Sequence, residues 1–218
     1  MKFFSKKSLG QNFLIDEKII DLIIHNGNIS KDDIVLEVGP GNGALTNKIL
    51  KKNPKEITVI EKDNLLAASL ERQFGNNLKI INEDMMNISY ENYVNKNLII
   101  FGNLPYNIST QILAKWIKMS NLENFCKKFV LMFQKEVADR IIAKKNDKNY
   151  GRLSILSNWK MKINKIVDIK PTSFKPSPKV MSTLLVLTPK KEFYHINNPK
   201  NLEHVTNIFF SNRRKMIK

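Results

Sequence analysis

A tetrapeptide near the middle of the 218-residue chain, Asn103-Leu104-Pro105-Tyr106, combines residue types that suit chemistry on a nucleobase. The exocyclic amine of a nucleobase is a poor nucleophile because its lone pair is delocalised into the ring. An enzyme that alkylates it needs acceptors that hold both N–H groups and turn the lone pair toward the electrophile. The Asn103 side-chain oxygen and the Leu104 backbone carbonyl are suitable acceptors. Pro105 would fix the loop, and Tyr106 would stack on the base.

A plainer interpretation of this segment is a turn that precedes a helix. Pro105 suits a turn, and Ser109 or Thr110 would cap the helix that follows. This interpretation accounts for Pro105 and the cap, but it does not account for Asn103 and Tyr106 together. We therefore favour the nucleobase chemistry, which requires no strong base because the amine becomes acidic once it is alkylated.

A glycine-rich segment follows an apolar run in the first quarter of the chain. Its glycines would let the backbone approach a ligand at the N-terminus of a helix. Gly39, Gly41 and Ala44 satisfy the dinucleotide-binding pattern G-x-G-x-x-G/A. Gly39, Gly41 and Gly43 equally make G-x-G-x-G, which suits a nucleoside without a pyrophosphate. Glu37 favours the second interpretation, because a carboxylate beside the loop repels phosphate but can pair with an ammonium group.

Two acidic residues stand at the ends of the next two apolar runs. Glu61 lies 22 residues after Gly39, where an acidic side chain can accept hydrogen bonds from both hydroxyls of a ribose. Asp84 could accept a hydrogen bond from an adenine amino group, and Met85 could pack on the base. Together with the glycine segment, these residues predict a cofactor of the adenosine type.

The elements that would position these residues alternate along the chain. Short β-branched runs, typical of buried parallel strands, occur at residues 34–38, 57–61, 78–81, 98–101 and 129–133. Helical patterns lie between and after them, at residues 43–52, 64–73, 110–119 and 134–145. This alternation predicts a doubly wound α/β sheet, to which strands at 165–169 and 183–187 would add. Pairing of the last two as a hairpin would make one of them antiparallel, and a final helix is expected over residues 201–218.

The charge of the chain is distributed unevenly. Lys and Arg number 36 and Asp and Glu 20, a net charge of +16. Residues 1–139 carry 18 basic and 16 acidic side chains, whereas residues 140–218 carry 18 basic and only four acidic ones. This asymmetry favours a polyanionic partner, with nucleic acid ahead of an anionic membrane. A Lys-rich composition that merely solvates the surface is the alternative, but it should enrich both parts alike.

Several classes of protein are disfavoured by composition. Apolar residues make up 42% of the chain, which argues against wholesale disorder. The longest purely apolar runs have about five residues, far fewer than the ~20 needed for a membrane span, and residues 1–7 lack the apolar stretch of a secretory signal. Cys126 is the only cysteine, and His25, His195 and His204 show no metal-ligand spacing. We expect a cytoplasmic protein without a metal site.

Six segments together resemble a known family. They are residues 11–14 (QNFL), 37–43 (EVGPGNG), 103–110 (NLPYNIST), 133–137 (FQKEV), 150–154 (YGRLS) and 174–180 (FKPSPKV). Their order and spacing are similar to those of the ribosomal RNA adenine N6,N6-dimethyltransferases, in particular the bacterial small-subunit type. The resemblance spans about residues 5–215. It implies a Rossmann-like class I methyltransferase sheet that uses S-adenosylmethionine (SAM) to dimethylate two adjacent adenosines in the 3′-terminal hairpin loop of 16S rRNA during small-subunit biogenesis.

The resemblance also implies roles for individual residues. SAM would contact Asn12, Leu14, Gly39, Gly41, Glu61, Asp84, Met85 and Asn103. The target amine would be oriented by Asn103 and the Leu104 carbonyl in the loop fixed by Pro105, while Tyr106 and Phe174 would grip the flipped base. Stacking on aromatic rings returns roughly 1–3 kcal/mol to an extruded base.

Basic residues in the second half would contact RNA phosphates. Lys175 and Lys179 flank Phe174, and Arg213, Arg214 and Lys215 form the tightest cluster. Lys160, Lys162 and Lys165, expected on a strand, are further candidates. Phosphate contacts supply affinity without sequence information, so these residues would position the RNA rather than select the adenosines.

The resemblance implies a methyltransferase domain over residues 1–190 and the start of a small C-terminal helical domain over residues 191–218. The last predicted helix reaches residue 218 without a Gly or Asn stop signal, and members of the family usually continue further. We therefore expect either a chain that is cut within this helix or an unusual short form. We expect a monomer whose partner is 16S rRNA in the small ribosomal subunit or its precursor, and no membrane partner.

Three other functions remain open from the sequence. A resistance-type 23S rRNA dimethyltransferase shares the fold and the Asn-x-Pro-Tyr loop. A non-catalytic assembly factor would retain only the fold, although Glu61, Asp84 and Asn103 argue against that hypothesis. A nicotinamide dehydrogenase is disfavoured by Glu37 and by the absence of an obvious catalytic His or Tyr-Lys pair.

Overall fold

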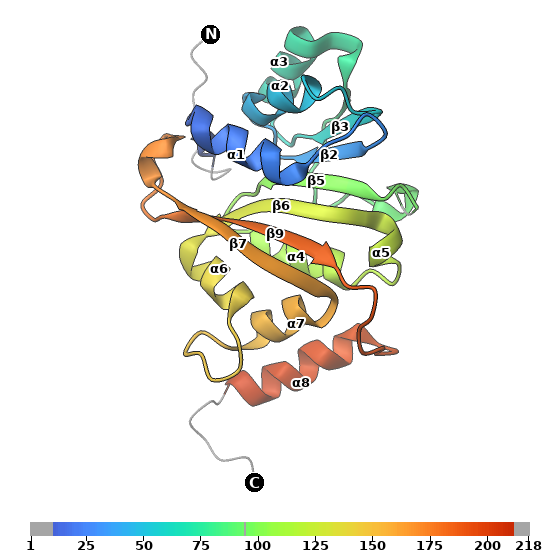
Figure 1. Ribbon diagram of the computed structural model, residues 1–218, viewed down its shortest axis with the longest axis vertical. Coiled ribbons are helices and arrows are strands. Elements are labelled where there is room, and N and C mark those ends of the chain that lie inside the picture. Colours follow the sequence, from blue (N-terminus) through green and yellow to red (C-terminus); the bar gives the residue numbers. More distant parts are fainter. Residues whose placement is uncertain (1–10, 94, 212–218) are drawn as a thin grey trace.

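A seven-stranded mixed sheet forms the centre of the molecule (Figure 1). The computed structural model of the chain describes residues 11–93 and 95–211. In spatial order the strands are β4 (Lys79–Ile81), β3 (Glu56–Ile60), β2 (Ile34–Val38), β5 (Leu98–Asn103), β6 (Cys126–Gln134), β9 (Ser182–Pro189) and β7 (Met161–Ile169). Neighbouring strands from β4 to β6 are parallel, and β9 is antiparallel to both of its neighbours. The predicted doubly wound α/β fold and its late antiparallel strand are thus confirmed.

Helices cover both faces of this sheet. One hydrophobic cluster joins the sheet to α1 (Glu17–Gly27), α2 (Ala44–Leu50) and α3 (Asn64–Phe74). The other joins it to α4 (Ser109–Ile117), α5 (Leu122–Phe125), α6 (Lys135–Ile142) and α7 (Arg152–Lys160). Because both faces are covered, the central strands are apolar throughout; every residue of β5 except its last is buried.

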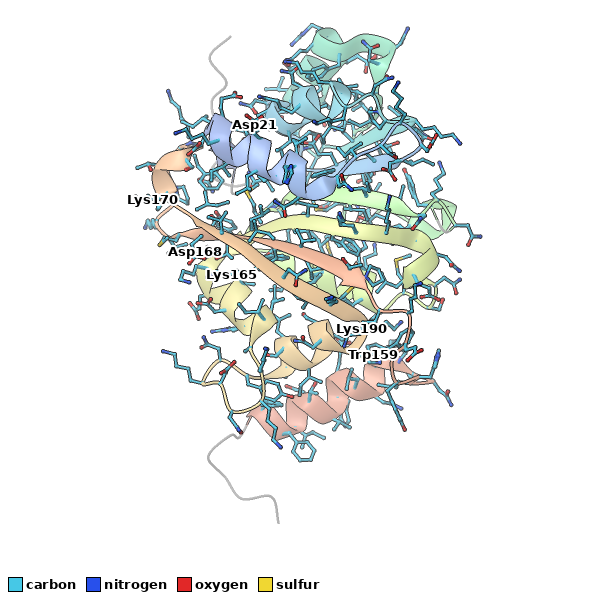
Figure 2. All side chains as sticks on the ribbon, viewed as in Figure 1. Asp21, Trp159, Lys165, Asp168, Lys170 and Lys190 are labelled. Carbon is cyan, nitrogen blue, oxygen red and sulfur yellow. The ribbon has the colours of Figure 1, made fainter. Side chains whose placement is uncertain are left out.

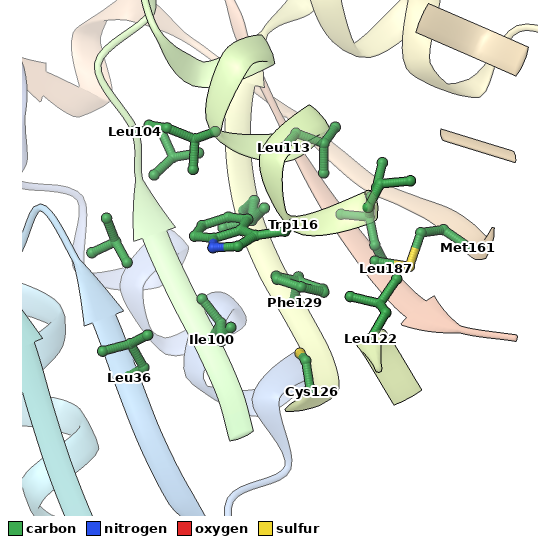
Figure 3. Packing of buried hydrophobic residues seen from close by; sticks show 14 of the residues in the cluster. Leu36, Ile100, Leu104, Leu113, Trp116, Leu122, Cys126, Phe129, Met161 and Leu187 are labelled. Carbon is green, nitrogen blue, oxygen red and sulfur yellow. The ribbon is translucent and has the colours of Figure 1, made fainter. Parts of the chain in front are cut away.

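The second cluster is centred on aromatic residues (Figure 3). The ring centroids of Trp116 on α4 and Phe129 on β6 lie 5.1 Å apart, and both side chains are fully buried. Leu104, the first residue after β5, is 1% exposed and belongs to the same cluster. The core therefore reaches the end of β5 and fixes the start of the loop that follows it.

A short second sheet ties an early segment to a late one. In it β1 (Phe13–Leu14) is antiparallel to β8 (Phe174–Lys175), with Leu14 opposite Phe174. Beside it, the Ile15 N–H donates to the Ser173 carbonyl at 2.9 Å, and the Ser173 hydroxyl donates to the Asp16 carboxylate at 2.8 Å. Residues 11–14 are consequently held across the edge of the main sheet.

Three helices, α1, the short α5 and α7, lie where no element was predicted. Before α1, the Asp16 side chain accepts hydrogen bonds from the N–H groups of Lys18 and Ile19. The helix α7 buries Ser154 and Ser157 completely, so its sequence lacks the apolar stripe from which helices are recognised.

Lys160 corrects one of the predicted RNA contacts. It ends α7 rather than lying on a strand, and it is 4% exposed. Its ammonium donates to the Met119 carbonyl at 2.7 Å and lies over the rings of Trp159 and Phe193. Burial lowers its pKa, and its contacts leave it unavailable to phosphate. Lys165 is exposed, but it pairs with Asp168 at 2.9 Å (Figure 2).

The last described helix, α8 (Pro199–Ser211), packs against α7. The Arg152 guanidinium donates to the Asn207 side chain at 2.9 Å, and Lys118 pairs with Glu203 at 3.1 Å. The division into domains at residue 190 stays a prediction. In the described part of the chain, no helix is both long enough and apolar enough to cross a membrane.

Candidate active site

A cavity opens at the carboxyl ends of the parallel strands, where ligands of open α/β sheets bind. All the predicted cofactor-binding residues line it: Asn12, Leu14, Gly39, Gly41, Glu61, Asp84, Met85 and Asn103. Leu104, Pro105 and Tyr106 line it as well. The fold thus brings together four loops and the segment 11–14 around one space.

The glycine loop between β2 and α2 requires glycine for both conformation and space. Gly39, Gly41 and Gly43 have φ angles of 72°, 59° and 79°, in the left-handed region. A Cβ atom on Gly43 would lie 2.8 Å from the Phe74 ring. Since Gly43 is constrained and Ala44 is simply the first residue of α2, the pattern G-x-G-x-G describes this loop better than the dinucleotide pattern does.

Two carboxylates beside this loop face the same cavity. Glu37 is 1% exposed and accepts a hydrogen bond from the Thr46 hydroxyl at 2.7 Å. Glu61 accepts from the N–H groups of Gly41 and Asp63, at 3.1 and 2.9 Å. Burial raises the pKa of both groups, that of Glu37 to about 7, and the Glu61 charge contributes to the latter increase.

Desolvated carboxylates favour a cationic ligand and repel a phosphate. The cavity therefore fits SAM, which carries a sulfonium and an ammonium group, better than it fits a dinucleotide with a pyrophosphate. The role of Glu61 as acceptor for the ribose hydroxyls stays a prediction, and Glu37, when ionised, would add negative charge at the base of the loop.

The loop after β4 is held rigidly from several sides. The Asp84 carboxylate accepts from the Lys62 ammonium at 2.8 Å and from the Met86 N–H at 2.9 Å, and both hydrogen bonds lower its pKa. The Tyr90 hydroxyl donates to the Met85 carbonyl at 3.1 Å, and Lys115 donates to the Met86 carbonyl at 2.8 Å. Asp84 is thus an ionised acceptor, next to the buried Met85 side chain.

Asn103 ends β5 at the cavity. Its amide nitrogen donates to the Asn12 backbone carbonyl at 2.8 Å. This hydrogen bond fixes the orientation of the amide and leaves the side-chain oxygen as the group that can accept from a substrate. The arrangement suits the predicted role of Asn103 as an acceptor for an amine.

The turn after Asn103 is also built from backbone hydrogen bonds. The Pro105 carbonyl accepts from the N–H groups of Ile108 and Ser109, at 3.1 and 3.0 Å. Ser109 is the first residue of α4, and its hydroxyl donates back to the Tyr106 carbonyl at 3.2 Å. No side chain caps α4, so the capped-turn interpretation was wrong in that respect.

The two predicted aromatic residues differ in their surroundings. Tyr106 is half-buried at the cavity, its hydroxyl is 2.5 Å from the Ser182 hydroxyl, and burial raises its pKa. Phe174 is 3% exposed and packs in the hydrophobic cluster of α1–α3; it is not among the residues that line the cavity. Phe174 pairs with Leu14, which does line the cavity, and its role in gripping the base stays a prediction.

Several cavity residues were not singled out from the sequence. Phe13 lies against Gly41, where a Cβ atom would approach its ring within 2.9 Å. The Gln11 amide donates to Asp63 at 3.1 Å, and Leu66 on α3 lines the wall of the cavity. Phe13 could have been predicted to line the cavity, because it stands between Asn12 and Leu14 in the sequence. No local pattern announces the contact between Gln11 and Asp63.

The predicted RNA contacts are only partly described by the structure. Lys175 and Lys179 are exposed. Arg213, Arg214 and Lys215 lie outside the described residues. Among residues 11–93 and 95–211, no group of three or more His, Cys, Asp or Glu side chains is arranged to hold a metal ion.

Comparison with known proteins gives consistent similarities. The profile of the family described as ribosomal RNA adenine dimethylase matches residues 2–218. The chain is 54% identical over 214 residues to ribosomal RNA small subunit methyltransferase A of Pelagibacter ubique, covering 98% of this chain and 81% of that protein. It is 42% identical to the protein of the same name from Ehrlichia chaffeensis, covering 100% and 82%.

Solved structures agree with the sequence similarities. A dimethyladenosine transferase from Plasmodium falciparum superposes with a TM-score of 0.83 and 33% identity, over 94% of this chain and 73% of that one. The 23S rRNA methyltransferase ErmE superposes with a TM-score of 0.71 and 25% identity, over 92% and 80%.

Proposed function

The chain belongs to the ribosomal RNA adenine dimethylase family, and from this premise we propose that it dimethylates N6 of two adjacent adenosines in the 3′-terminal hairpin loop of 16S rRNA during small-subunit biogenesis. It is a methyltransferase whose methyl donor is SAM. The relatives named as small-subunit enzymes, with identities of 54% and 42%, support the 16S substrate.

One observation carries the proposal furthest. The cavity has two desolvated carboxylates, Glu37 and Glu61, on one side and the Asn103–Tyr106 loop on the other. The first side suits a cationic adenosine cofactor, and the second suits an exocyclic amine. A site for a donor and a site for an acceptor of a methyl group thus adjoin each other.

The cofactor side would hold SAM through the acids at the strand ends. The Glu61 carboxylate accepts from the ribose hydroxyls and the Asp84 carboxylate from the adenine amino group, while Met85 packs on the adenine. Asn12, Leu14, Gly39 and Gly41 complete the contacts. When bound, SAM supplies an activated methyl group on its sulfonium.

The other side would hold the target adenine. The Asn103 side-chain oxygen and the Leu104 carbonyl accept the two N–H groups of the amine and so direct its lone pair toward the donor. The Leu104 side chain is buried in the core, which holds the backbone carbonyl of the same residue in a fixed position as an acceptor. Tyr106 stacks on the flipped base, which repays part of the cost of unstacking. Water accepts the proton released after methylation, so no side-chain base is required.

RNA would approach over the basic surface beside the cavity, where Lys175 and Lys179 contact phosphates. Arg213, Arg214 and Lys215 are proposed to extend this surface. We further propose that the protein is cytoplasmic, since the rRNA substrate is cytoplasmic in bacteria. We also propose that it is a monomer, and light scattering of the purified protein would measure its mass in solution.

Labelling with tritiated SAM tests the substrate. Each purified ribosomal subunit is incubated with the protein, and the 16S hairpin is then examined by mass spectrometry for two dimethylated adenosines. Label found only in 23S rRNA would identify the resistance-type activity instead, and calorimetry showing no SAM binding would indicate an assembly factor without catalysis.

A further inference from the structure

A residue outside the proposed site holds the ring of Tyr106. Ser182, the first residue of β9, is fully buried, and its hydroxyl lies 2.5 Å from the Tyr106 hydroxyl. The two residues are 76 positions apart in the chain. The hydrogen bond therefore links the loop that receives the target base to a strand in the interior of the sheet.

Ser182 is a rigid point of attachment. Its backbone pairs with Gln134 of β6 on one side and with Ile169 of β7 on the other. At the opposite end of the tyrosine, the Tyr106 carbonyl accepts a hydrogen bond from the Ser109 hydroxyl at 3.2 Å. Tyr106 is thus held at its backbone by α4 and at its hydroxyl by β9.

We propose that Ser182 is a positioning residue that fixes where the Tyr106 ring lies, restrains its plane, and thereby aligns the target adenine with the methyl donor. This inference rests on the proposed function, in which the adenine stacks on that ring. The hydroxyl oxygen lies on the axis about which χ2 turns, so its hydrogen bond fixes the direction in which the ring points. The bond also restrains χ2, whose distribution is otherwise broad, because a phenol hydroxyl forms hydrogen bonds close to its ring plane. A stacked base follows the ring, and small errors in the alignment of reacting atoms cost rate rather than binding.

Replacing Ser182 with Ala tests the proposal. We expect the single-turnover rate at saturating RNA and SAM to fall about tenfold, because the ring loses its anchor. The dissociation constant for SAM should change by less than about twofold, since Ser182 does not line the cavity. Tyr106→Phe removes the same hydrogen bond from the other side and should lower the rate equally. The double variant should be no slower than either single variant.

Thr183→Val is the matched control. Thr183 follows Ser182 on the same strand, is equally buried, and donates to the Asp168 carboxylate at 2.7 Å. This variant loses the hydrogen bond of the neighbouring hydroxyl without touching Tyr106. Because the acceptor is a charged carboxylate, it should lower the melting temperature at least as much as Ser182→Ala does while keeping the wild-type rate.

The outcomes separate this inference from the proposed function. A wild-type rate for Ser182→Ala, combined with a large loss for Tyr106→Ala, overturns the positioning role alone. Equal losses of rate and SAM affinity in Ser182→Ala also overturn it, because they indicate general damage to the site. If Ser182→Ala does not fold, Tyr106→Phe decides in its place, since a wild-type rate there would show that the hydrogen bond is dispensable. Absence of 16S methylation by the wild-type protein would instead refute the proposed function.

Discussion

The two sides of the cavity are built in different ways. On the cofactor side, Gly39 directly follows β2 and Glu61 directly follows β3. The Glu61 carboxylate accepts from the Asp63 N–H, two positions away, and from the Gly41 N–H, 20 positions away. On the target side, Asn103 is held by Asn12, 91 residues away, and Tyr106 is held by a strand that follows it by 76 residues.

This difference indicates that SAM binding and alignment of the target base depend on different parts of the fold. Gly41, Glu61 and Asp84 are held by segments within about 20 positions, so this part of the cofactor side needs only β2, β3, β4 and the loops that follow them. Asn12 and Leu14, which complete it, are placed by distant segments. The target side is oriented by distant segments, so it depends on the complete fold. Substitutions on the two sides should accordingly separate SAM affinity from turnover.

Asn103→Ala should give the largest effect. We expect the single-turnover rate to fall by about a hundredfold or more, because the amine loses the acceptor that orients it. The SAM dissociation constant should rise far less, which calorimetry would measure. Asn158→Ala is the control, since the Asn158 amide also donates to backbone carbonyls, of Ile141 and Ser154, away from the cavity. Equal losses of rate and affinity in Asn103→Ala would remove the distinction between the two sides.

Glu61→Ala should show the converse pattern. The carboxylate would accept two hydroxyl groups of SAM, and hydrogen bonds to a charged group contribute roughly 1.5–3 kcal/mol each. We expect SAM to bind about a hundred times more weakly or worse, whereas the rate at saturating SAM should change much less. Glu61→Gln keeps one acceptor oxygen, so its SAM affinity should lie between those of the wild-type protein and Glu61→Ala. An unchanged dissociation constant would show that the ribose assignment is wrong.

SAM affinity should depend on pH through Glu37. Burial raises the pKa of this group to about 7, so it is largely protonated below that pH in the free protein. Because the ionised form attracts a cation, the affinity should increase about tenfold between pH 6 and pH 8. The same elevated pKa means that the free energy of unfolding of the free protein should decrease as pH rises from the ordinary value of 4.5 to about 7.

Glu37→Gln distinguishes the Glu37 contribution from titration of SAM itself. Calorimetry on this variant should show a much flatter dependence of affinity on pH. A pH dependence as steep as that of the wild-type protein would mean that Glu37 does not face the cofactor.

Lys175→Ala and Lys179→Ala should give the smallest effects. Each is expected to weaken binding to small subunits a few-fold and to reduce the slope of log affinity against log salt by about one. SAM affinity should stay unchanged, because both side chains lie outside the cavity. Filter binding over a salt series would measure the slope. A slope identical to that of the wild-type protein would show that these lysines contact water and not RNA phosphates.

Strand positions were accessible from the sequence where burial on both faces produced continuous apolar runs. Residues 34–38 were predicted with the observed bounds of β2. The strand β6 contains the predicted residues 129–133 and extends to Cys126 at one end and to Gln134 at the other. The helix α1 carried a detectable signal, namely the capping residue Asp16 ahead of Ile20, Ile23 and Ile24. The helix α7 carried none, because two of its buried positions are serines.

In the site, too, only residues with a local signal in the sequence could be predicted. Glu61 and Asp84 could be located because strand ends meet at one edge of a parallel sheet. The pairing of Tyr106 with Ser182 could not, since neither residue's neighbours indicate the other. The burial of Phe174 was missed for a related reason, since its pairing with Leu14 joins distant segments; its stacking on the base stays a prediction.

That small sheet bears on how the protein is made. The hydrogen bond from Ser173 to Asp16 spans 157 positions, and the pairing of β1 with β8 is similarly distant. At translation rates of roughly 5–20 residues per second, Asp16 is synthesised roughly 8–30 seconds before Ser173. Segment 11–14 consequently takes its place over the cavity late in synthesis. A nascent chain that has already formed its first strands cannot yet act, and methylating capacity arrives only when nearly all of the described chain has been translated.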